Sequence, residues 1–351
     1  MSISADERRA RILVEVQRLG SVRVVSLAQR LGLPAVTVRR DVAALADTGA
    51  VRRSHGSVSV ATGHVHRPVD GPLLGLLVPA VGQYFAEVIA GAREAADSAG
   101  AHLVLGISPY EAGADRDQVE QLLRSGVEGL LLAPNWLPSD RPDAQAWVRE
   151  LAVPTVLVER RPAPDNPAAE LDSVSSDHHH GILTALRHLS SLGRQRVALV
   201  ARRDTWTAHQ VRSGYFAGCE FLGLAEESVI DSIDPRTDAE AVADRIVRLR
   251  ERGVDAVLVH NDQDAIQLLP LLRSRGLGVP EDLAVISYDD VFASLGAPPL
   301  TAVAPPKKAV GAEAVELLLR RTAGDASAPP VRHVQLLPAL TVRDSCGGPV
   351  R

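Results

Sequence analysis

The chain has 351 residues, a length that suits two or three domains of ordinary size. Its composition is 46% hydrophobic and 23% charged, which is typical of a globular chain with a sizeable core and excludes a disordered or fibrous one. No stretch approaches the roughly 18 consecutive apolar residues of a membrane span, and the polar run after Met1 does not resemble a signal peptide. The two cysteines, Cys219 and Cys346, have no framework spacing, which favours a reducing cytoplasm over a disulfide-stabilised fold.

The net charge of −5 is divided unevenly along the chain. Residues 1–60 contain ten arginines and five acidic residues and carry +5, whereas the rest of the chain carries −10. Basic side chains attract the phosphates of nucleic acids. The asymmetry therefore predicts that any nucleic-acid contact lies in the first sixty residues.

Residues 7–60 have the pattern of three short helices followed by a hairpin. The apolar residues of the first helix recur at helical spacing up to Gly20, and a second helix, capped by Ser26, is predicted to end at Gly32. A third helix is predicted over residues 36–47, and residues 50–60 have the pattern of two strands around a glycine turn. This order of elements predicts a winged helix-turn-helix domain.

In such a domain the third helix enters the major groove, and the hairpin, or wing, lies near phosphates or the minor groove. An arginine can bond a guanine edge through two hydrogen bonds, and a threonine offers both a hydroxyl and a methyl group. For each single residue, the alternative is a side chain that only solvates the surface. The predicted DNA contacts are Thr37, Arg39 and Arg40 on the third helix and Arg52, Arg53 and His55 on the wing.

The pattern divides the chain into four parts. Residues 1–60 form the predicted DNA-binding domain, and residues 61–71 form a linker interrupted by glycine and proline. The linker has no apolar helical face, so we do not expect it to fold as a hinge helix. Residues 72–345 form a larger domain of two lobes, the second starting near residue 162, and residues 346–351 form a tail.

Short apolar runs alternate with helical stretches throughout the larger domain. Continuous apolar strands between amphipathic helices predict parallel sheets covered on both faces, which is an α/β fold. The cycle restarts after Asp177, so two similar lobes with a cleft between them are expected. The predicted strands are 73–78, 102–107, 129–133, 155–158, 197–200, 229–233, 256–259 and 284–287, and the predicted helices are 84–98, 116–125, 143–151, 178–192, 211–222, 239–252 and 264–275.

Ligands of open α/β sheets bind beyond the carboxyl ends of the strands, so the loops there supply candidate residues. Aromatic faces, carboxylates and an arginine suit a small polar ligand such as a sugar. Each candidate also has an ordinary structural alternative: aromatic side chains fill cores, and Asp262 could equally cap the helix that follows it. The candidates from these loops are Tyr84, Phe85, Trp206, Arg212, Asp262 and Asp289.

The first sixty residues resemble the DeoR-type DNA-binding domain. The resemblance rests on the run Thr37-Val38-Arg39-Arg40-Asp41-Val42 and on Arg52-Arg53-Ser54-His55-Gly56 in the wing. Ser57 stands where this family usually has a second glycine.

Residues 72–343 resemble the ligand-binding domain of LacI/GalR-type regulators, which is related to periplasmic sugar-binding proteins. The segments that carry the resemblance include Tyr84-Phe85-Ala86-Glu87, Asn261-Asp262-Gln263, Ser287-Tyr288-Asp289-Asp290 and Pro299-Leu300-Thr301. The resemblance implies that Tyr84, Phe85, Asp262 and Asp289 face the effector, and it adds Asp177 to the candidate site.

The chain departs from the LacI/GalR pattern at two of these positions. The usual Asp-Asn pair is Asp177-His178 here. The effector-binding arginine of that family stands three residues before a Gly-aromatic pair, whereas Arg212 stands two before Gly214-Tyr215. Either the helix is shifted by one residue, or Val211 occupies that position and Arg212 points elsewhere.

The expected function is a cytoplasmic transcriptional regulator, a repressor, that binds an operator in double-stranded DNA as a homodimer. A small effector between the lobes would control it; a sugar or sugar derivative follows from the resemblance, and a nucleoside or another metabolite stays open. The direction of the effector's influence on DNA affinity also stays open. A solute-binding protein without a DNA role is the less favoured alternative, because it would not carry a basic winged head.

Catalytic chemistry and cofactors are not expected. No phosphate-binding loop, dinucleotide fingerprint or nucleophile elbow occurs in the sequence. The run His178-His179-His180 suggests a metal site, but adjacent helical residues point about 100° apart and do not converge on one ion. A polar cluster at the start of a helix is the simpler interpretation.

Overall fold

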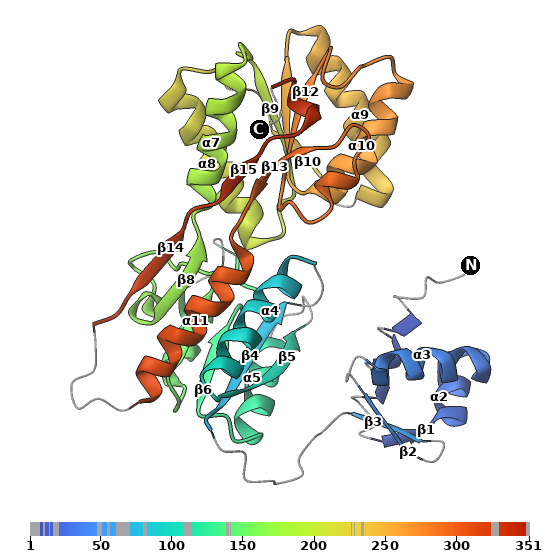
Figure 1. Ribbon diagram of the computed structural model, residues 1–351, viewed down its shortest axis with the longest axis vertical. Coiled ribbons are helices and arrows are strands. Elements are labelled where there is room, and N and C mark those ends of the chain that lie inside the picture. The colour runs from blue at the N-terminus through green and yellow to red at the C-terminus, as the bar shows by residue number, and fades with distance from the viewer. Residues whose placement is uncertain are drawn as a thin grey trace. The chain divides into compact units, whose positions relative to one another are not determined.

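The structure is a computed structural model and divides into two units, Met1–Val69 and Asp70–Arg351, which we name the head and the body (Figure 1). The α/β fold with parallel sheets, preceded by a helix-turn-helix, confirms the predicted fold class. The structure describes residues 8–9, 11–13, 15–16, 21–47, 51–54, 57–60, 71–79, 83–108, 114–137, 140, 142–225, 227, 229–232, 235–323 and 330–348.

The head contains a helix-turn-helix beside a three-stranded antiparallel sheet. The described part of residues 8–16 is helical. It is followed by β1 (Ser21–Arg23), α2 (Val24–Leu31), α3 (Ala35–Asp47), β2 (Val51–Ser54) and β3 (Ser57–Val60), and the sheet order is β1-β3-β2. One apolar core joins all of these elements, and it is formed by Ile12, Val16, Val24, Leu27, Ala28, Val38, Val42, Val51 and Val58.

Two local features of the head differ from the prediction. The second helix begins at Val24 and not after Ser26, because the preceding residues pair with β3 as a strand, Val22 opposite Val58. Gly32 ends this helix at φ +63°, a left-handed conformation that favours glycine. The wing is therefore a three-stranded sheet and not a two-stranded hairpin alone.

The first lobe of the body has a six-stranded, all-parallel sheet of order β14-β8-β7-β6-β4-β5. Helices α4 and α11 cover one face, and α5 with the short helices α6 and η1 lies on the other. The strands are β4 (Leu73–Pro79), β5 (His102–Ser108), β6 (Gly129–Leu132), β7 (Thr155–Val158), β8 (Asp172–Ser176) and β14 (His333–Leu336); the helices are α4 (Gln83–Ser98), α5 (Ala114–Arg124), α6 (Pro142–Gln145), η1 (Ala146–Glu150), η2 (Pro167–Glu170) and α11 (Lys307–Thr322).

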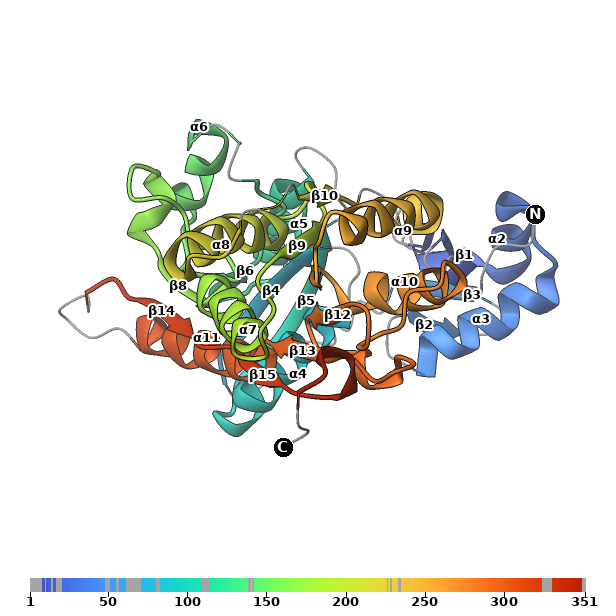
Figure 2. The same ribbon diagram turned by 90° about the horizontal axis from the view of Figure 1, so that it is seen from above.

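The second lobe has a six-stranded sheet of order β10-β9-β11-β12-β13-β15, parallel except for the pairing of β13 with β15. Helices α7 and α8 cover one face, and α9 and α10 the other (Figure 2). The strands are β9 (Val197–Ala201), β10 (Ile230–Asp231), β11 (Ala256–Val259), β12 (Ala284–Tyr288), β13 (Thr301–Ala304) and β15 (Ala339–Thr341); the helices are α7 (His178–Ser191), α8 (Trp206–Leu222), α9 (Pro235–Glu251), α10 (Asp262–Ser274), η3 (Ala293–Leu295) and η4 (Asp344–Cys346).

The chain crosses between the lobes three times: from β8 to α7, from β13 to α11, and from β14 to β15 (Figure 1). The second lobe therefore starts near Asp177 and not near residue 162, since β8 belongs to the first sheet. The C-terminal elements α11 and β14 also return to the first lobe, which the sequence pattern did not indicate. Cys346, expected in a tail, is buried in the core of the second lobe.

Helices α4 and α11 lie in direct backbone contact in the first lobe. A Cβ atom at Gly91 would stand 1.9 Å from the carbonyl oxygen of Lys308, and one at Gly311 would stand 2.0 Å from that of Val88. Only glycine permits this approach, so α11, although it comes late in the chain, is fixed against α4.

Candidate functional site

A cavity of about 980 Å³ lies between the two lobes of the body and is named here the interlobe cavity. The first lobe contributes the segment after β7 and the end of β8, and the second contributes the starts of α7 and α8. Its size falls within the usual range for small-molecule sites. The side chains that line it and enter the argument below are Glu159, Asp177, His178, Trp206 and Gln210.

Glu159 is a buried carboxylate at the wall of this cavity, with 1% of its surface exposed. The hydroxyl of Tyr84 donates to Oε1 over 2.6 Å, and the hydroxyl and amide of Ser176 donate to Oε1 and Oε2 over 2.9 and 3.0 Å. Its backbone φ of +53° is uncommon for a residue with a side chain. Three hydrogen bonds, one from α4 and two from β8, thus fix this carboxylate at the cavity wall.

His178, Tyr288 and His260 form a buried chain in the second lobe. Nδ1 of His178 lies 2.8 Å from the hydroxyl of Tyr288, and the ring of Tyr288 lies 5.5 Å from that of His260. Burial lowers the pKa of His178, and burial with the neighbouring His178 lowers that of His260 to about 3. Both rings are therefore neutral, and Nε2 of His178 and Nδ1 of His260 have no hydrogen-bond partner among the described residues.

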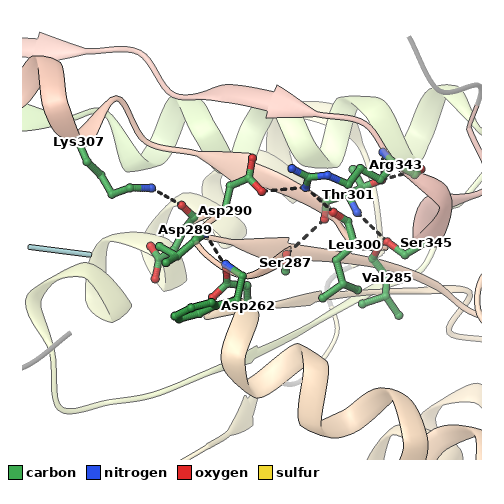
Figure 3. Close-up of polar contacts among 12 residues, drawn as sticks. Asp262, Val285, Ser287, Asp289, Asp290, Leu300, Thr301, Lys307, Arg343 and Ser345 are labelled. Carbon is green, nitrogen blue, oxygen red and sulfur yellow. Dashed lines mark hydrogen bonds and ion pairs between the residues drawn. The ribbon is translucent and has the colours of Figure 1, made fainter. Parts of the chain in front are cut away.

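The loop after β12 is held from three sides (Figure 3). Asp262 accepts hydrogen bonds from the amides of Val291 and Phe292 over 2.7 and 2.5 Å. The side chain of Lys307 donates to the carbonyl oxygen of Asp289, and Arg343 forms an ion pair with Asp290 at 2.8 Å. The loop is thereby fixed in a defined conformation.

Asp289 itself has features of a binding residue. Its Oδ1 atom is buried and has no partner among the described residues, and its φ is +88°. Burial, followed by the charge of Asp262, raises the pKa of Asp289 to about 7. Buried unpaired polar atoms and unusual backbone angles concentrate at functional sites.

The predicted effector residues are distributed unevenly over this region. Asp177 and Trp206 line the interlobe cavity. Tyr84 reaches its wall through Glu159, and Phe85 packs edge-on against Tyr84 at 5.4 Å between ring centres. Asp177 also caps α7, because it accepts a hydrogen bond from the amide of His180.

The structure differs from the prediction for Arg212 and Asp262. The guanidinium of Arg212 donates to the carbonyl oxygens of Ala201 and Arg202 and pairs with Asp231, and it does not line the cavity. Val211, the alternative occupant of that position, is fully buried in the core. Asp262 holds the loop after β12, while Asn261 and not Asp262 caps α10.

The three adjacent histidines point to different partners. His178 contacts Tyr288, and Nε2 of His179 lies 2.7 Å from the hydroxyl of Ser213. Within the described ranges, no group of three or more histidine, cysteine, aspartate or glutamate residues could hold a metal ion. Among the same described residues, no helix has the length and apolarity that crossing a membrane requires.

Helix α3 of the head presents polar side chains to solvent. Arg39 and Arg40 are exposed and Thr37 is half-buried, while Val38 and Val42 on the opposite face enter the core. Asp41 is buried and pairs with Arg8 at 2.6 Å, so it anchors α3 to the first helical segment. The backbone of Arg52 and Arg53 lies in β2, but their side chains, His55 and residues 61–70 fall outside the described residues.

Comparison with known proteins agrees with both units. Residues 8–63 match a family model described as a DeoR-like helix-turn-helix domain, and residues 186–346 match one described as a periplasmic binding protein-like domain. The chain is 27% identical over 278 residues to the HTH-type transcriptional regulator DegA of Bacillus subtilis (strain 168), covering 78% of this chain and 80% of that protein.

Two further similarities extend over most of the chain. The arabinose metabolism transcriptional repressor of Geobacillus stearothermophilus is 25% identical over 338 residues, which span 91% of this chain and 89% of the relative. A solved complex of the transcriptional regulator CelR with cellobiose superimposes with a TM-score of 0.67 and 25% identity, over 89% of this chain and 90% of that one.

A helix-turn-helix head with an exposed arginine-bearing helix, followed by a two-lobed body with a polar cavity, defines a DNA-binding transcriptional regulator controlled by a small effector. More particularly, residues 8–63 of the head match the DeoR-like helix-turn-helix model, and residues 186–346 of the body match the periplasmic binding protein-like one. Both resemblances found in the sequence are thus confirmed.

Several residues of the site were not found from the sequence. Glu159, Ser176 and Lys307 lie in segments that the pattern treated as a connection or left unassigned. His178 was noticed as part of a histidine run and as the residue that replaces asparagine after Asp177, but it was not predicted as a site residue. A signal for Glu159 existed, since it directly follows the apolar strand β7, where loop residues of a parallel sheet meet the cleft.

Proposed function

We propose that this regulator is a repressor whose effector is a sugar or sugar derivative bound in the interlobe cavity. The observation that carries the proposal is Nε2 of the buried His178, which makes no hydrogen bond to the described residues and has the carboxylate of Glu159 at 3.7 Å. His178 lines the cavity together with Trp206. A sugar hydroxyl would satisfy this atom, and the indole would cover the apolar C–H face of the ring. The names of the two relatives that mention arabinose and cellobiose support the same ligand class.

Asp177 and Gln210 supply further polar groups at the cavity wall. We assign ligand contact to Asp177, His178 and Trp206. Tyr84 and Phe85 are assigned an indirect role, in which they position Glu159 at the cavity wall. Asp289 is assigned a polar contact through its unpartnered Oδ1 atom. Arg212 and Asp262 are assigned to holding the protein's own backbone, since their side chains are already engaged there.

In the head we assign base contact to Thr37, Arg39 and Arg40 and backbone contact to Arg52, Arg53 and His55. A homodimer would place two recognition helices on a two-fold operator. The edge strand β5 supports self-association, because Leu105 and Ile107 on it are 37% and 41% exposed. The chain acts by binding alone, in the cytoplasm where its DNA lies, without catalysis or a cofactor.

The test is a thermal-shift screen of the full chain with arabinose, ribose, glucose, galactose, cellobiose, adenosine and cytidine. A ligand at 100 times its Kd stabilises the native state by about 2.7 kcal/mol. We expect a sugar to raise the Tm of the wild type and of Trp147→Ala, but not of Trp206→Ala. Trp147 is a matched control, because it is partly buried and packs against the same apolar cluster as Trp206 but does not line the cavity.

Two results would contradict the proposal. A response to adenosine or cytidine alone would replace the sugar with a nucleoside as the effector class. An equal sugar response in Trp206→Ala and Trp147→Ala would show that the sugar binds elsewhere.

A further inference from the structure

Lys307 is a buried ammonium group at the first residue of α11, directly after the chain returns from the second lobe. Its side chain is 3% exposed. Only Lys307 and Lys308 are lysines in a chain with 38 basic residues, so this position departs from a strong preference for arginine. A lysine offers a compact charge with three donors, whereas an arginine offers a planar fork that needs more room.

The contacts of this ammonium group come from both lobes. Nζ donates to the carbonyl oxygen of Asp289, which follows β12 of the second lobe, over 2.5 Å (Figure 3). In the first lobe, it lies 3.4 Å from Oε1 of Glu87 on α4 and 5.7 Å from the ring centre of Tyr84. One charge thus connects α4 with the loop after β12, apart from the three covalent crossings.

Breaking either contact is costly because the group is buried. A buried charge that loses its partners keeps its desolvation penalty, and removing one member of such a pair destabilises strongly. A cation over an aromatic ring adds attraction that grows when water is excluded. The ammonium therefore favours the one arrangement of the lobes in which Asp289, Glu87 and Tyr84 all surround it.

The same residues lead to the interlobe cavity. The hydroxyl of Tyr84 donates to Glu159, which lines the cavity. The hydrogen bond from Lys307 to the backbone carbonyl of Asp289 fixes the position of that residue, whose side-chain Oδ1 atom is unpartnered. A ligand that moved Glu159 or Asp289 would change the surroundings of Lys307. The covalent return through α11 then carries this change to α4, against which α11 packs through Gly91 and Gly311.

We propose that Lys307 is an interlobe latch: a positioning residue that holds the loop after β12 against α4 and couples occupancy of the interlobe cavity to the arrangement of the lobes. The proposal rests on the proposed function in taking this cavity as the effector site. Its test uses no effector, so it can fail while the proposed function stands.

The chain supplies a matched control in the next residue. Lys308 is 59% exposed and pairs at 3.5 Å with Glu94, also on α4, without reaching the second lobe. Lys307→Met and Lys308→Met therefore remove the same charge from adjacent positions of the same helix. Only the first change removes a contact between lobes.

The experiment measures backbone amide exchange and the interlobe distance in the full chain. Spin labels at Arg124→Cys on α5 and Arg248→Cys on α9 report the distance, since both positions are exposed and the native cysteines are buried. For Lys307→Met, we expect exchange of the amides at 84–88 and 288–292 to accelerate at least about fivefold, as local opening becomes easier. The distance distribution should broaden, and Lys308→Met should match the wild type in both measurements.

A second variant keeps the test decisive if Lys307→Met does not fold. Glu87→Gln leaves the ammonium in place and removes its carboxylate partner on α4, which is 42% exposed. We expect the same two changes at smaller size. Unchanged exchange and an unchanged distance distribution in the folded variants would overturn the proposal, as would equal changes in Lys308→Met.

Discussion

The hydroxyl of Tyr288 lies 2.8 Å from Nδ1 of His178, and this contact helps to determine which nitrogen of the buried imidazole carries the proton. Nε2 of the same ring lies 3.7 Å from a carboxylate oxygen of Glu159, so a proton is favoured on Nε2. Nδ1 then accepts the hydrogen bond that Tyr288 donates. Burial raises the pKa of Tyr288 well above its ordinary value and lowers that of His178, which keeps both groups neutral.

We expect Tyr288→Phe to destabilise the chain by about 1–2 kcal/mol, because a buried nitrogen loses its donor. It should also weaken sugar binding, since the tautomer of His178 is no longer fixed. Chemical denaturation and calorimetric titration measure the two effects. Tyr215→Phe is the matched control: it loses a buried hydroxyl that donates to Val197, in the core and away from the cavity. Equal sugar affinity in both variants would contradict the role of Tyr288.

Because of Asp289, the free energy of unfolding should decrease as the pH rises from about 4 to about 7. Its pKa is about 7 in the folded chain and about 3.9 when unfolded, so the folded state alone holds the proton in this range. The contribution is complete below pH 4 and is lost by pH 7. We expect Asp289→Asn to remove this part of the pH dependence of the unfolding free energy, and exposed Asp97→Asn to leave it unchanged. Identical profiles for Asp289→Asn and wild type would refute the assignment.

His260 should have the opposite effect on the free energy of unfolding, which decreases as the pH falls. Its pKa falls from about 6.5 in the unfolded chain to about 3 in the folded one, so the unfolded state takes up the proton first. Stability from this group is present above pH 6.5 and is lost as the pH falls towards 3. We expect His260→Asn to lose less stability than wild type between pH 7 and pH 5, with exposed His102→Asn behaving as wild type. An unaltered loss in His260→Asn would argue against a buried neutral ring.

In the head, Arg39→Ala and Arg40→Ala distinguish base contacts from phosphate contacts. A lost guanine contact costs about 1–3 kcal/mol and relaxes specificity at one position, whereas a lost phosphate contact lowers the salt slope by about 1. Titration of the DNA upstream of the protein's own gene, at several salt concentrations, measures both. Arg124→Ala in the body, 70% exposed, is the control. Unchanged affinity and slope in both head variants would remove α3 from the interface.

The sequence predicted most elements of both lobes up to β12 because their apolar periodicity is strong, but it missed β8 and the return of the chain to the first lobe. The apolar residues of β13 and α11 have the same local pattern wherever they pack, so only the tertiary structure assigns them to a lobe. Strand β8 was missed because Asp172–Ser176 is mostly polar, although all five residues are buried.

The site was predicted less well than the fold. The loop positions after strands pointed to Trp206, which lines the interlobe cavity, and to Asp289, which is not among the residues that line it, whereas Asp177, which also lines the cavity, came from the family resemblance. Arg212 and Asp262 were expected to face the ligand, but side-chain direction depends on partners distant in sequence, such as Asp231 and Phe292. Lys307 had no local signal, because its contacts come from residues more than fifteen positions away.

The first lobe is built from two stretches of chain separated by the whole of the second lobe, with α11 and β14 arriving last. During synthesis, α4 and the neighbouring face of the sheet, with Val88 and Ala92, stay uncovered until residues beyond Lys307 have left the ribosome. The head and the continuous stretch of the second lobe from α7 to β13 can become compact before α11 is synthesised. Premature termination ahead of α11 would therefore release a chain with an open apolar face, prone to aggregation and not merely short of a terminus.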